Sequence, residues 1–282
     1  MRSPLQPSSQ PPWPVPRFIQ ASVAWHAAAA GWAMVQPGMW PWALAGVAVN
    51  HLGITAAGLW PRSQWLGPNI TRLGAAATAQ GALALTIDDG PDPEVTPWVL
   101  DALEAHGIRA TFFCIAERAR RHPRCVQQIV ERGHSVQNHS YSHPHSFSLR
   151  GPRGLRQEIR AAQAVLTELS GQQPTCFRAP AGLRNPFLDP VLHREGLQLV
   201  SWTRRGFDTR ERSPQKVADR LTIRLAAGDI LLVHDGHAAR DLQGRPVILG
   251  VLPLLAERAR AQGLHWATLP AVLADPPTEQ MA

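Results

Sequence analysis

The feature that most constrains this chain is a pair of adjacent carboxylates at the end of an apolar run. Residues 82–85 are apolar and lead into residues 86–91, which read Thr-Ile-Asp-Asp-Gly-Pro. A short apolar run that ends in turn residues predicts a buried strand followed by a sharp break. Because the backbone twists at a strand end, Asp88 and Asp89 can both face one pocket. A polar strand-to-loop turn would explain these residues equally well on their own, so the functional interpretation depends on other segments.

Strand-like and helix-like stretches alternate from residue 82 onward. Strands are predicted at residues 82–88, 110–115, 135–138, 176–178, 197–202, 229–233 and 264–268, each separated from the next by a helical stretch. Regular alternation implies parallel strands joined by right-handed crossovers. A glycine-rich phosphate-binding motif follows none of these strands. The sequence therefore predicts a closed or nearly closed (β/α) barrel, in which chemistry gathers at the C-terminal ends of the strands.

The charge distribution argues against a nucleic-acid partner. The chain has 282 residues and a formal net charge of +7, of which residues 1–87 contribute +4 through four arginines and no acid. The remaining +3 is not clustered in the way a nucleic-acid-binding face requires. Three cysteines in a chain of this length do not form a disulfide framework.

An uncharged segment precedes the barrel. Residues 18–60 contain no Asp, Glu, Lys or Arg, and two apolar stretches at 18–35 and 40–60 fill most of the segment. Each stretch approaches the roughly 20 residues that cross a bilayer, but His26, Asn50 and His51 lie inside them. The segment is too long and too clearly double for a signal peptide. We predict a membrane hairpin, and helices that lie at the interface or pack on a soluble domain are the alternative.

The few charges around this segment predict its orientation. Arg2 and Arg17 precede the segment, and Arg62 and Arg72 follow it. The positive-inside rule then places the catalytic domain on the cytoplasmic side of a bacterial inner membrane, with the periplasm as the alternative, and makes membrane lipid a partner of residues 18–60. We expect a disordered Pro-rich tail at 1–17, the hairpin at 18–60, a linker at 61–80, the catalytic domain at 81–275 and a tail at 276–282.

Two histidines follow the predicted strand 135–138. Residues 138–143 read Asn-His-Ser-Tyr-Ser-His, so His139 and His143 are four residues apart and share one face if the segment turns helically. With one carboxylate they form a two-His, one-carboxylate set, which leaves positions on a metal open for water and substrate. A polar loop with surface histidines is the alternative.

Three more polar side chains lie beyond predicted strands. Residues 177–182 read Phe-Arg-Ala-Pro-Ala-Gly, and the guanidinium fork of Arg178 suits a buried carboxylate. The apolar residues 231–233 end in His234, whose imidazole can titrate near neutrality. Asp208 could orient His234 by accepting its second N–H. A solvated arginine and a histidine at a sheet edge are the alternatives.

These motifs resemble a known family. Thr-Ile-Asp-Asp-Gly-Pro, His-Ser-Tyr-Ser-His, Arg-Ala-Pro-Ala-Gly and Leu-Leu-Val-His occur in the order and spacing of the NodB-homology polysaccharide deacetylases, carbohydrate esterase family 4, and the resemblance covers residues 82–268. It implies a distorted (β/α)7 barrel of NodB type, here preceded by the N-terminal helical hairpin. It also implies a divalent metal, usually Zn²⁺, and a hydrolase that acts on non-peptide carbon–nitrogen bonds of N-acylated amino sugars.

The resemblance implies a role for each matched residue. Asp88 would be the general base, held by Arg178, and His234 would be the general acid, with Asp208 as its partner. The metal ligands would be Asp89, His139 and His143. The expected substrate contacts are Pro180, Trp202 and Leu232, of which Leu232 would line the acyl pocket.

The sequence departs from the family pattern at two places. Ala181 stands where an aromatic residue usually precedes the glycine, and Arg205 and Thr209 replace the first Asp and the Trp of an Asp-x-x-Asp-Trp motif. These positions bear on substrate contacts rather than on the metal. We predict removal of N-acyl groups, acetyl in particular, from a polysaccharide or other glycan. The alternatives are deacetylation or deformylation of a lipid-linked amino sugar at the inner membrane, and a catalytically inactive carbohydrate-binding protein on the same barrel.

Overall fold

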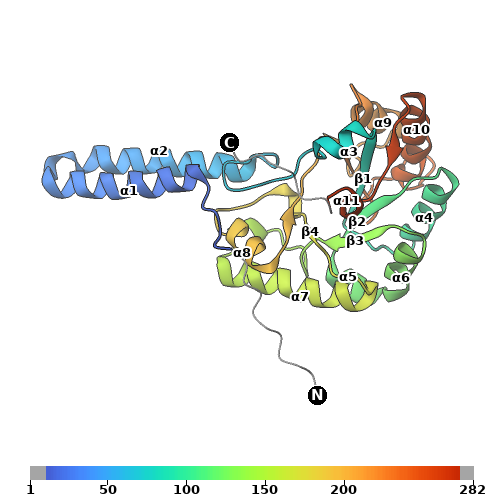
Figure 1. Ribbon diagram of the computed structural model, residues 1–282, viewed down its shortest axis with the longest axis horizontal. Coiled ribbons are helices and arrows are strands. Elements are labelled where there is room, and N and C mark those ends of the chain that lie inside the picture. Colours follow the sequence, from blue (N-terminus) through green and yellow to red (C-terminus); the bar gives the residue numbers. More distant parts are fainter. Residues whose placement is uncertain (1–10, 274–282) are drawn as a thin grey trace, which may run out of the picture.

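A curled sheet of parallel strands forms the centre of the catalytic region, and helices cover its outer face (Figure 1). The computed structural model describes residues 11–273. Residues 1–10 of the predicted N-terminal tail and the predicted tail at 276–282 lie outside the described residues. Every strand pairing is parallel, and the order is β5-β4-β3-β2-β1-β7-β6, with β8 also paired to β1.

The central strand is β1 (Ala82–Asp88), whose seven residues are all buried. Both of its faces are covered, which is typical of a parallel strand. Its neighbours are β2 (Ala110–Cys114) and β7 (Ile230–His234). The other strands are β3 (Ser135–Asn138), β4 (Cys176–Phe177), β5 (Gln198–Leu199), β6 (Arg204–Arg205) and β8 (His265–Trp266).

Alternate residues of β1 pack into two different cores, because successive strand side chains point to opposite faces. Leu85 and Ile87 join the outer core beneath the helices. Ala84 joins an inner core with Phe113. The same alternation puts Asp88 on the inner face, at the C-terminal end of the strand.

Most helices of the catalytic region connect one strand to the next, and α3 precedes β1. They are α3 (Ala75–Ala79), α4 (Thr96–Ala105), α5 (Ala116–Arg121), α6 (Pro123–Glu131), α7 (Pro152–Ser170), α8 (Leu188–Glu195), α9 (Pro214–Thr222), α10 (Val247–Ala261) and α11 (Leu269–Leu273), with short 3-10 turns at η2 (Phe147–Leu149) and η3 (Pro180–Gly182). Helix α7 ends at Gly171, whose φ of 70° provides the left-handed cap that commonly terminates a helix.

The structure confirms the predicted distorted (β/α) barrel and changes one strand. The predicted strand 197–202 is shortened to β5, and β6 begins beyond its predicted end, because the chain changes partners between the two. The Val200 N–H donates to Phe177 O, whereas the Thr203 N–H donates to Ile230 O. Residues 200–203 therefore cross between the two ends of the sheet, and Ile70 from the predicted linker forms a parallel bridge with Val200. An apolar pattern does not reveal such a change of partner.

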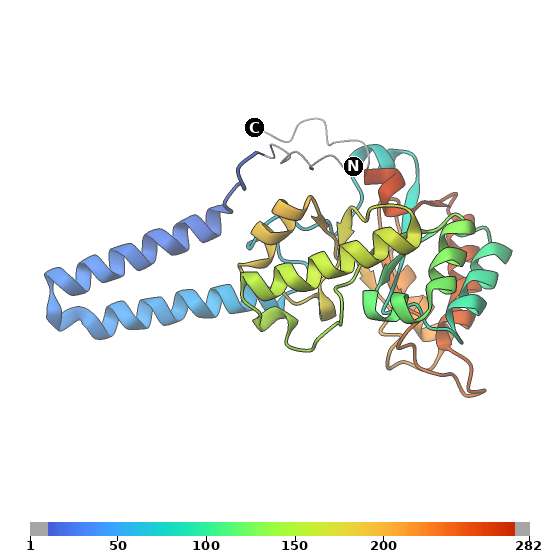
Figure 2. The same cartoon turned by 90° about the horizontal axis from the view of Figure 1, so that it is seen from below.

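The N-terminal segment forms a hairpin that projects from the catalytic region (Figures 1 and 2). Its elements are α1 (Arg17–Val35), η1 (Pro37–Met39) and α2 (Trp40–Leu59). Polar contacts cross between the helices: Asn50 Nδ2 donates to Ser22 Oγ at 2.7 Å, and the Nε2 atoms of His26 and His51 lie 3.2 Å apart. Among residues 11–273, the segment Pro37–Leu59 is the one helix whose length and apolar composition would allow it to cross a membrane. Core helices of soluble proteins and signal sequences meet the same criterion.

The base of the hairpin packs against the catalytic region. Arg184 N–H donates to Gly58 O at 3.1 Å, and Ser201 Oγ donates to Pro61 O at 2.6 Å. Preceding α1, the Trp13 indole N–H donates to Asp189 Oδ2 at 2.6 Å, a contact that the expected disorder of residues 1–17 did not foresee. The predicted linker 61–80 contributes buried residues to the cores and contains α3.

Candidate metal centre and active site

The two carboxylates of β1 face the same imidazole. His139 Nε2 lies 3.2 Å from Asp89 Oδ1 and 3.9 Å from Asp88 Oδ2. Adjacent strand residues would point to opposite faces, but Asp89 has a φ of 72°. This left-handed conformation is uncommon for a residue other than glycine and tends to occur at functional sites. It turns the second carboxylate back into the site, as the sequence pattern suggested.

Three donor atoms converge at this point. The nearest candidate ligand atoms of Asp89, His139 and His143 all lie within 4.8 Å of one another. His143 Nε2 is 3.4 Å from Asp89 Oδ1. Burial would raise the pKa of Asp89, but hydrogen bonds from His139 and His237 outweigh burial and hold this pKa well below its usual range.

The His139 ring has a defined orientation. Its Nδ1 lies 2.8 Å from Arg178 O, and a carbonyl oxygen only accepts hydrogen bonds. Nδ1 therefore carries a proton, and in the neutral ring the Nε2 lone pair faces the Asp89 carboxylate. Burial would lower the pKa of His139, but the charge of Asp88 and the hydrogen bond and charge of Asp89 raise it. The two atoms are therefore held together either by a proton on Nε2 or by a metal cation that replaces this proton. Two imidazole nitrogens and one carboxylate oxygen suit Zn²⁺ and related divalent metals, so these residues fit the metal that the sequence predicts.

The histidine pair converges through a loop rather than through a helix. The condition of a helical turn at 139–143 is not met, because Ser140 and His143 have φ values of 64° and 51°. Asn138 Oδ1 accepts from the Ser140 N–H at 2.9 Å, and Ser140 Oγ accepts from the His143 N–H at 3.0 Å. These side-chain contacts with the backbone replace the helical hydrogen bonds on which the spacing argument relied.

A carboxylate that the sequence analysis missed supports this loop. Glu158 of α7 accepts hydrogen bonds from the Tyr141 N–H at 3.1 Å and from the Ser142 N–H at 3.0 Å. It also accepts from Ser142 Oγ at 2.9 Å. A glutamate on the buried side of a helix with a polar exposed face could have indicated such a role.

Arg178 is buried inside the barrel, next to Asp88. Its side chain is 1% exposed, and its Nη1 donates to Asp88 Oδ1 at 2.6 Å. Its remaining hydrogen bonds go to Thr86 Oγ1 at 2.8 Å, Ser201 O at 2.7 Å and Val200 O at 3.2 Å. Burial lowers the pKa of Arg178, and the charge of Asp88 acts in the opposite direction. The guanidinium therefore orients Asp88 with a full set of partners of its own.

His234 and Asp208 form a second buried pair. His234 Nδ1 lies 3.0 Å from Asp208 Oδ1, and the His234 N–H donates to Asp208 Oδ2 at 2.7 Å. Burial would lower the pKa of His234, but the charge and hydrogen bond of Asp208, aided by Asp88 and Asp89, raise it to about 9. His234 is therefore protonated at neutral pH and can donate a proton.

His237 also reaches the site and was not predicted. Its Nδ1 lies 2.9 Å from Asp89 Oδ2. Arg118 donates to Asp89 O at 2.9 Å, and its Nη2 lies 3.0 Å from His237 Nε2. Because a guanidinium only donates, His237 Nδ1 carries the proton that Asp89 accepts. The position of His237, three residues after the end of β7, was the signal available in the sequence.

The three residues expected to contact substrate lie around this centre. Leu232 is 2% exposed on β7 and Trp202 is 7% exposed on the crossing segment, while Pro180 is buried in η3. Trp202 packs closely against Gly182, whose φ of 72° and lack of a side chain both fit this position. Substrate contact by these three residues stays a prediction.

Comparison with known proteins gives a consistent result. A family model described as polysaccharide deacetylase matches residues 75–200. A peptidoglycan-N-acetylglucosamine deacetylase of Bacillus cereus is 31% identical over 195 residues, which cover 67% of each chain. A chitooligosaccharide deacetylase of Azorhizobium caulinodans is 31% identical over 198 residues, which cover 68% of this chain and 94% of the relative. Some longer relatives are matched over about a third of their length.

A solved structure agrees with these relatives. The crystal structure of a peptidoglycan N-acetylglucosamine deacetylase in complex with an N-oxidanyl-benzamide has a TM-score of 0.67 to this chain at 26% identity. The match covers 75% of this chain and 95% of the other. The part of this chain with the two aspartates, the two loop histidines and Arg178 falls within the residues matched by the family model.

Proposed function

Because this chain belongs to the polysaccharide deacetylase family and is a hydrolase of carbon–nitrogen bonds, we propose that it removes acetyl groups from the amino sugars of a glycan with the help of a divalent metal. The observation that carries the proposal is one set of contacts at the C-terminal ends of the strands. An ionisable carboxylate, a protonated imidazole and three convergent donor atoms lie together there. A purely structural or carbohydrate-binding protein would have no use for this combination.

The proposed metal ligands are Asp89, His139 and His143, and Zn²⁺ is the proposed ion. The bound metal would polarise the acyl carbonyl and lower the pKa of a water molecule towards about 7. Arg178 O and the Glu158-supported loop would fix the two imidazoles in the orientation that ligation needs, which is a common arrangement around metal-binding histidines.

Asp88 is the proposed general base. Its Oδ1 accepts a hydrogen bond from the Arg178 guanidinium, which orients the carboxylate, and Asp88 would accept the proton of the attacking water. His234 is the proposed general acid, and it would donate its proton to the departing nitrogen. Asp208 would keep His234 charged and correctly oriented. Each of the two groups thus has its own buried partner, Arg178 for Asp88 and Asp208 for His234.

The substrate proposal follows the relatives. They are named for peptidoglycan and chitooligosaccharides, both of which contain N-acetylated amino sugars. Neither is named for a lipid-linked sugar. We therefore propose an N-acetylated glycan as the substrate of this chain.

The test is acetate release from an N-acetylglucosamine pentamer by the zinc-loaded full chain, with and without a chelator. We expect chelator-sensitive release. Asp88→Asn should lower kcat by at least about 10²–10⁴-fold while metal stays bound. His139→Ala should lose both metal and activity, whereas His106→Ala serves as a matched histidine control outside the site. Full activity of Asp88→Asn, or stoichiometric metal in His139→Ala, would refute the assignments.

We further propose that residues 18–60 anchor the chain to a bacterial inner membrane and that residues 81–275 form its catalytic domain. The uncharged sequence and many exposed apolar side chains on the hairpin, such as Trp42, Val49 and Leu52, support this proposal. Flotation of the full chain with phospholipid vesicles, compared with residues 61–282, tests anchoring. Protease treatment of spheroplasts tests the side: protection is expected on the cytoplasmic side, and digestion would place the domain in the periplasm.

A further inference from the structure

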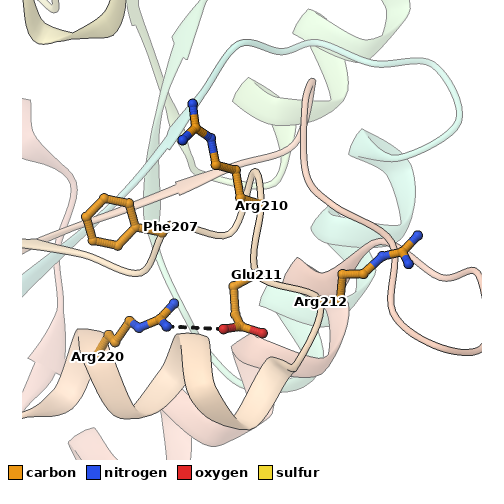
Figure 3. Close-up of a pocket in the computed structure, with 5 residues that line it drawn as sticks. All are labelled: Phe207, Arg210, Glu211, Arg212 and Arg220. Carbon is orange, nitrogen blue, oxygen red and sulfur yellow. Dashed lines mark ion pairs between the residues drawn. The ribbon is translucent and has the colours of Figure 1, made fainter.

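An arginine-rich cavity lies on the loop that carries Asp208. The cavity is a shallow surface depression, widely open to solvent, with a volume of about 600 Å³, and it is lined by Phe207, Arg210, Glu211, Arg212 and Arg220 (Figure 3). Glu211 pairs with Arg220, with 3.1 Å between Glu211 Oε2 and Arg220 Nη2. Three arginines and one glutamate leave a surplus of two positive charges on the lining, one of them on Arg212, which points to the other side of the loop. This surplus is the chemistry that recognises an anion.

The cavity combines this charge with an exposed aromatic face. Phe207 is 51% exposed and has a φ of 60°, which directs a large apolar side chain outward at a conformational cost. In Figure 3 the Phe207 ring lies between the guanidinium groups of Arg210 and Arg220, and Arg212 points to the other side of the loop. An aromatic ring beside cationic forks can hold the apolar face of a sugar while the forks bind its anionic substituent.

The cavity is linked to the active site through the buried Asp208 and through a row of partly buried side chains. Phe207 immediately precedes Asp208, which accepts hydrogen bonds from His234 and whose carbonyl accepts from the Ala239 N–H at 2.8 Å. The Arg205 guanidinium lies 5.2 Å from the Phe207 ring centroid and 5.5 Å from that of Trp202.

This row of stacked groups ends at the catalytic centre. Trp202 lies 5.9 Å from the guanidinium of Arg178, which donates to Asp88. One continuous series of aromatic and guanidinium groups therefore runs from the carboxylate that is the proposed base to the cavity. Arg205, the residue that departs from the family pattern, occupies its middle.

We propose that the cavity is an anion-binding subsite, which holds a carboxylate or phosphate on a unit of the glycan near the N-acetyl sugar being hydrolysed. The inference rests on the proposed function and extends it, because it assigns the substrate to the class of anionic amino-sugar glycans. Arg210 is the arginine proposed to bind the anion, since it is exposed and forms no ion pair among the described residues. Arg220, in contrast, forms an ion pair with Glu211.

The position of the cavity favours a glycan over a membrane surface as the occupant. The loop leads into α9, which lies on the side of the catalytic region away from the projecting hairpin (Figure 1). A lipid surface that held the hairpin would therefore not cover this loop. The active site, in contrast, is joined to the cavity along the chain, since Phe207 lines the cavity and the adjacent Asp208 contacts His234.

The test uses the full, zinc-loaded chain and two matched probes. One is a soluble peptidoglycan fragment with free carboxylates, and the other is the same fragment with these carboxylates converted to methylamides. We expect a higher kcat/KM and a lower Kd for the carboxylate form, and Arg210→Gln should reduce this preference about 3- to 10-fold. Arg210→Lys should restore part of it, and Arg153→Gln on α7 is the matched surface control. Adding salt should weaken the preference.

If neither fragment is turned over, isothermal titration calorimetry still tests the proposal. The ratio of the Kd values for the carboxylate and the methylamide fragments then measures the preference. UDP-N-acetylglucosamine serves as a diphosphate probe: tighter Arg210-dependent binding of this compound than of the carboxylate fragment would identify phosphate as the anion. Equal loss on both fragments in Arg210→Gln, or no loss on either, would overturn the subsite. Loss of vesicle binding without loss of carboxylate preference would assign the arginines to a membrane surface instead.

Discussion

The replacement Arg178→Met tests whether the site depends on one buried charge pair. Arg178 is 1% exposed and Asp88 is 4% exposed, with 2.6 Å between Nη1 and Oδ1. The variant would keep a side chain of comparable length but leave the Asp88 carboxylate in the barrel without its ion pair. Removing one partner of a buried pair costs about 3–5 kcal/mol, mainly because the other charge stays buried.

The other hydrogen bonds of Arg178 add to this cost in free energy of unfolding. Two backbone carbonyls, of Val200 and Ser201, and the Thr86 hydroxyl would also lose their donor. Each buried acceptor left without a partner costs about 1 kcal/mol or more, so we expect a total near the upper end of the range. For a chain of this size 1 kcal/mol corresponds to about 2–4 °C in Tm, which predicts a decrease of about 10–15 °C.

The assay is thermal unfolding of the metal-free protein, followed by chemical denaturation for the free energy of unfolding. Arg178→Lys should fall between the wild type and Arg178→Met, because an ammonium keeps the charge but cannot form the fork. Arg121→Met is the control, since Arg121 pairs with Glu117 at 2.7 Å on an exposed helix face and such pairs contribute about 0.3–0.5 kcal/mol. An Arg178→Met protein within about 1 kcal/mol of the wild type would refute the reasoning.

Three further predictions concern neighbouring groups. Asp208→Asn should shift the alkaline limb of the pH profile of kcat to lower pH. In the wild type Asp208 opposes burial and raises the pKa of His234 to about 9, so activity should fall as His234 loses its proton near that pH. An alkaline limb that does not move would contradict the assignment of His234 as the general acid. The same raised pKa means that His234 stabilises the fold fully below its ordinary value of 6.5, and that this stability is lost as the pH rises through about 9. His237→Ala should weaken Zn²⁺ binding about 10- to 100-fold, because the hydrogen bond from His237 orients Asp89, and His237→Asn should recover part of the loss. Competition with a fluorescent chelator measures the Zn²⁺ affinity of both variants. Unchanged affinity in His237→Ala would exclude His237 from this role.

The sequence predicted the strands that depend on local pattern and missed contacts that depend on distant partners. It predicted β1 at 82–88, because an apolar run and a Gly-Pro break define both ends. It did not predict β6, whose two arginines pair with β7 only through their backbones. The predicted barrel was therefore correct as an arrangement of strands, while its opening between β5 and β6 required the structure.

The candidate site shows the same division. The four-residue spacing of His139 and His143 identified the pair, although a loop held by Asn138 and Glu158 brings them together. His237 lies 148 positions from Asp89 in the chain, and no local pattern relates the two. Residues adjacent to motifs could be predicted, whereas those that act through a long-range hydrogen bond could not.

The join between the hairpin and the catalytic region has a mechanical consequence. A methyl group on Gly58 would overlap Arg184 O, and one on Gly182 would contact both Pro61 and Trp202. The base of the hairpin therefore packs in direct contact with the segment that follows Arg178. A surface that binds the hairpin would therefore also fix the distance and the angle of the active site relative to that surface. The enzyme would then act on glycan at one fixed distance, unlike a domain on a flexible linker.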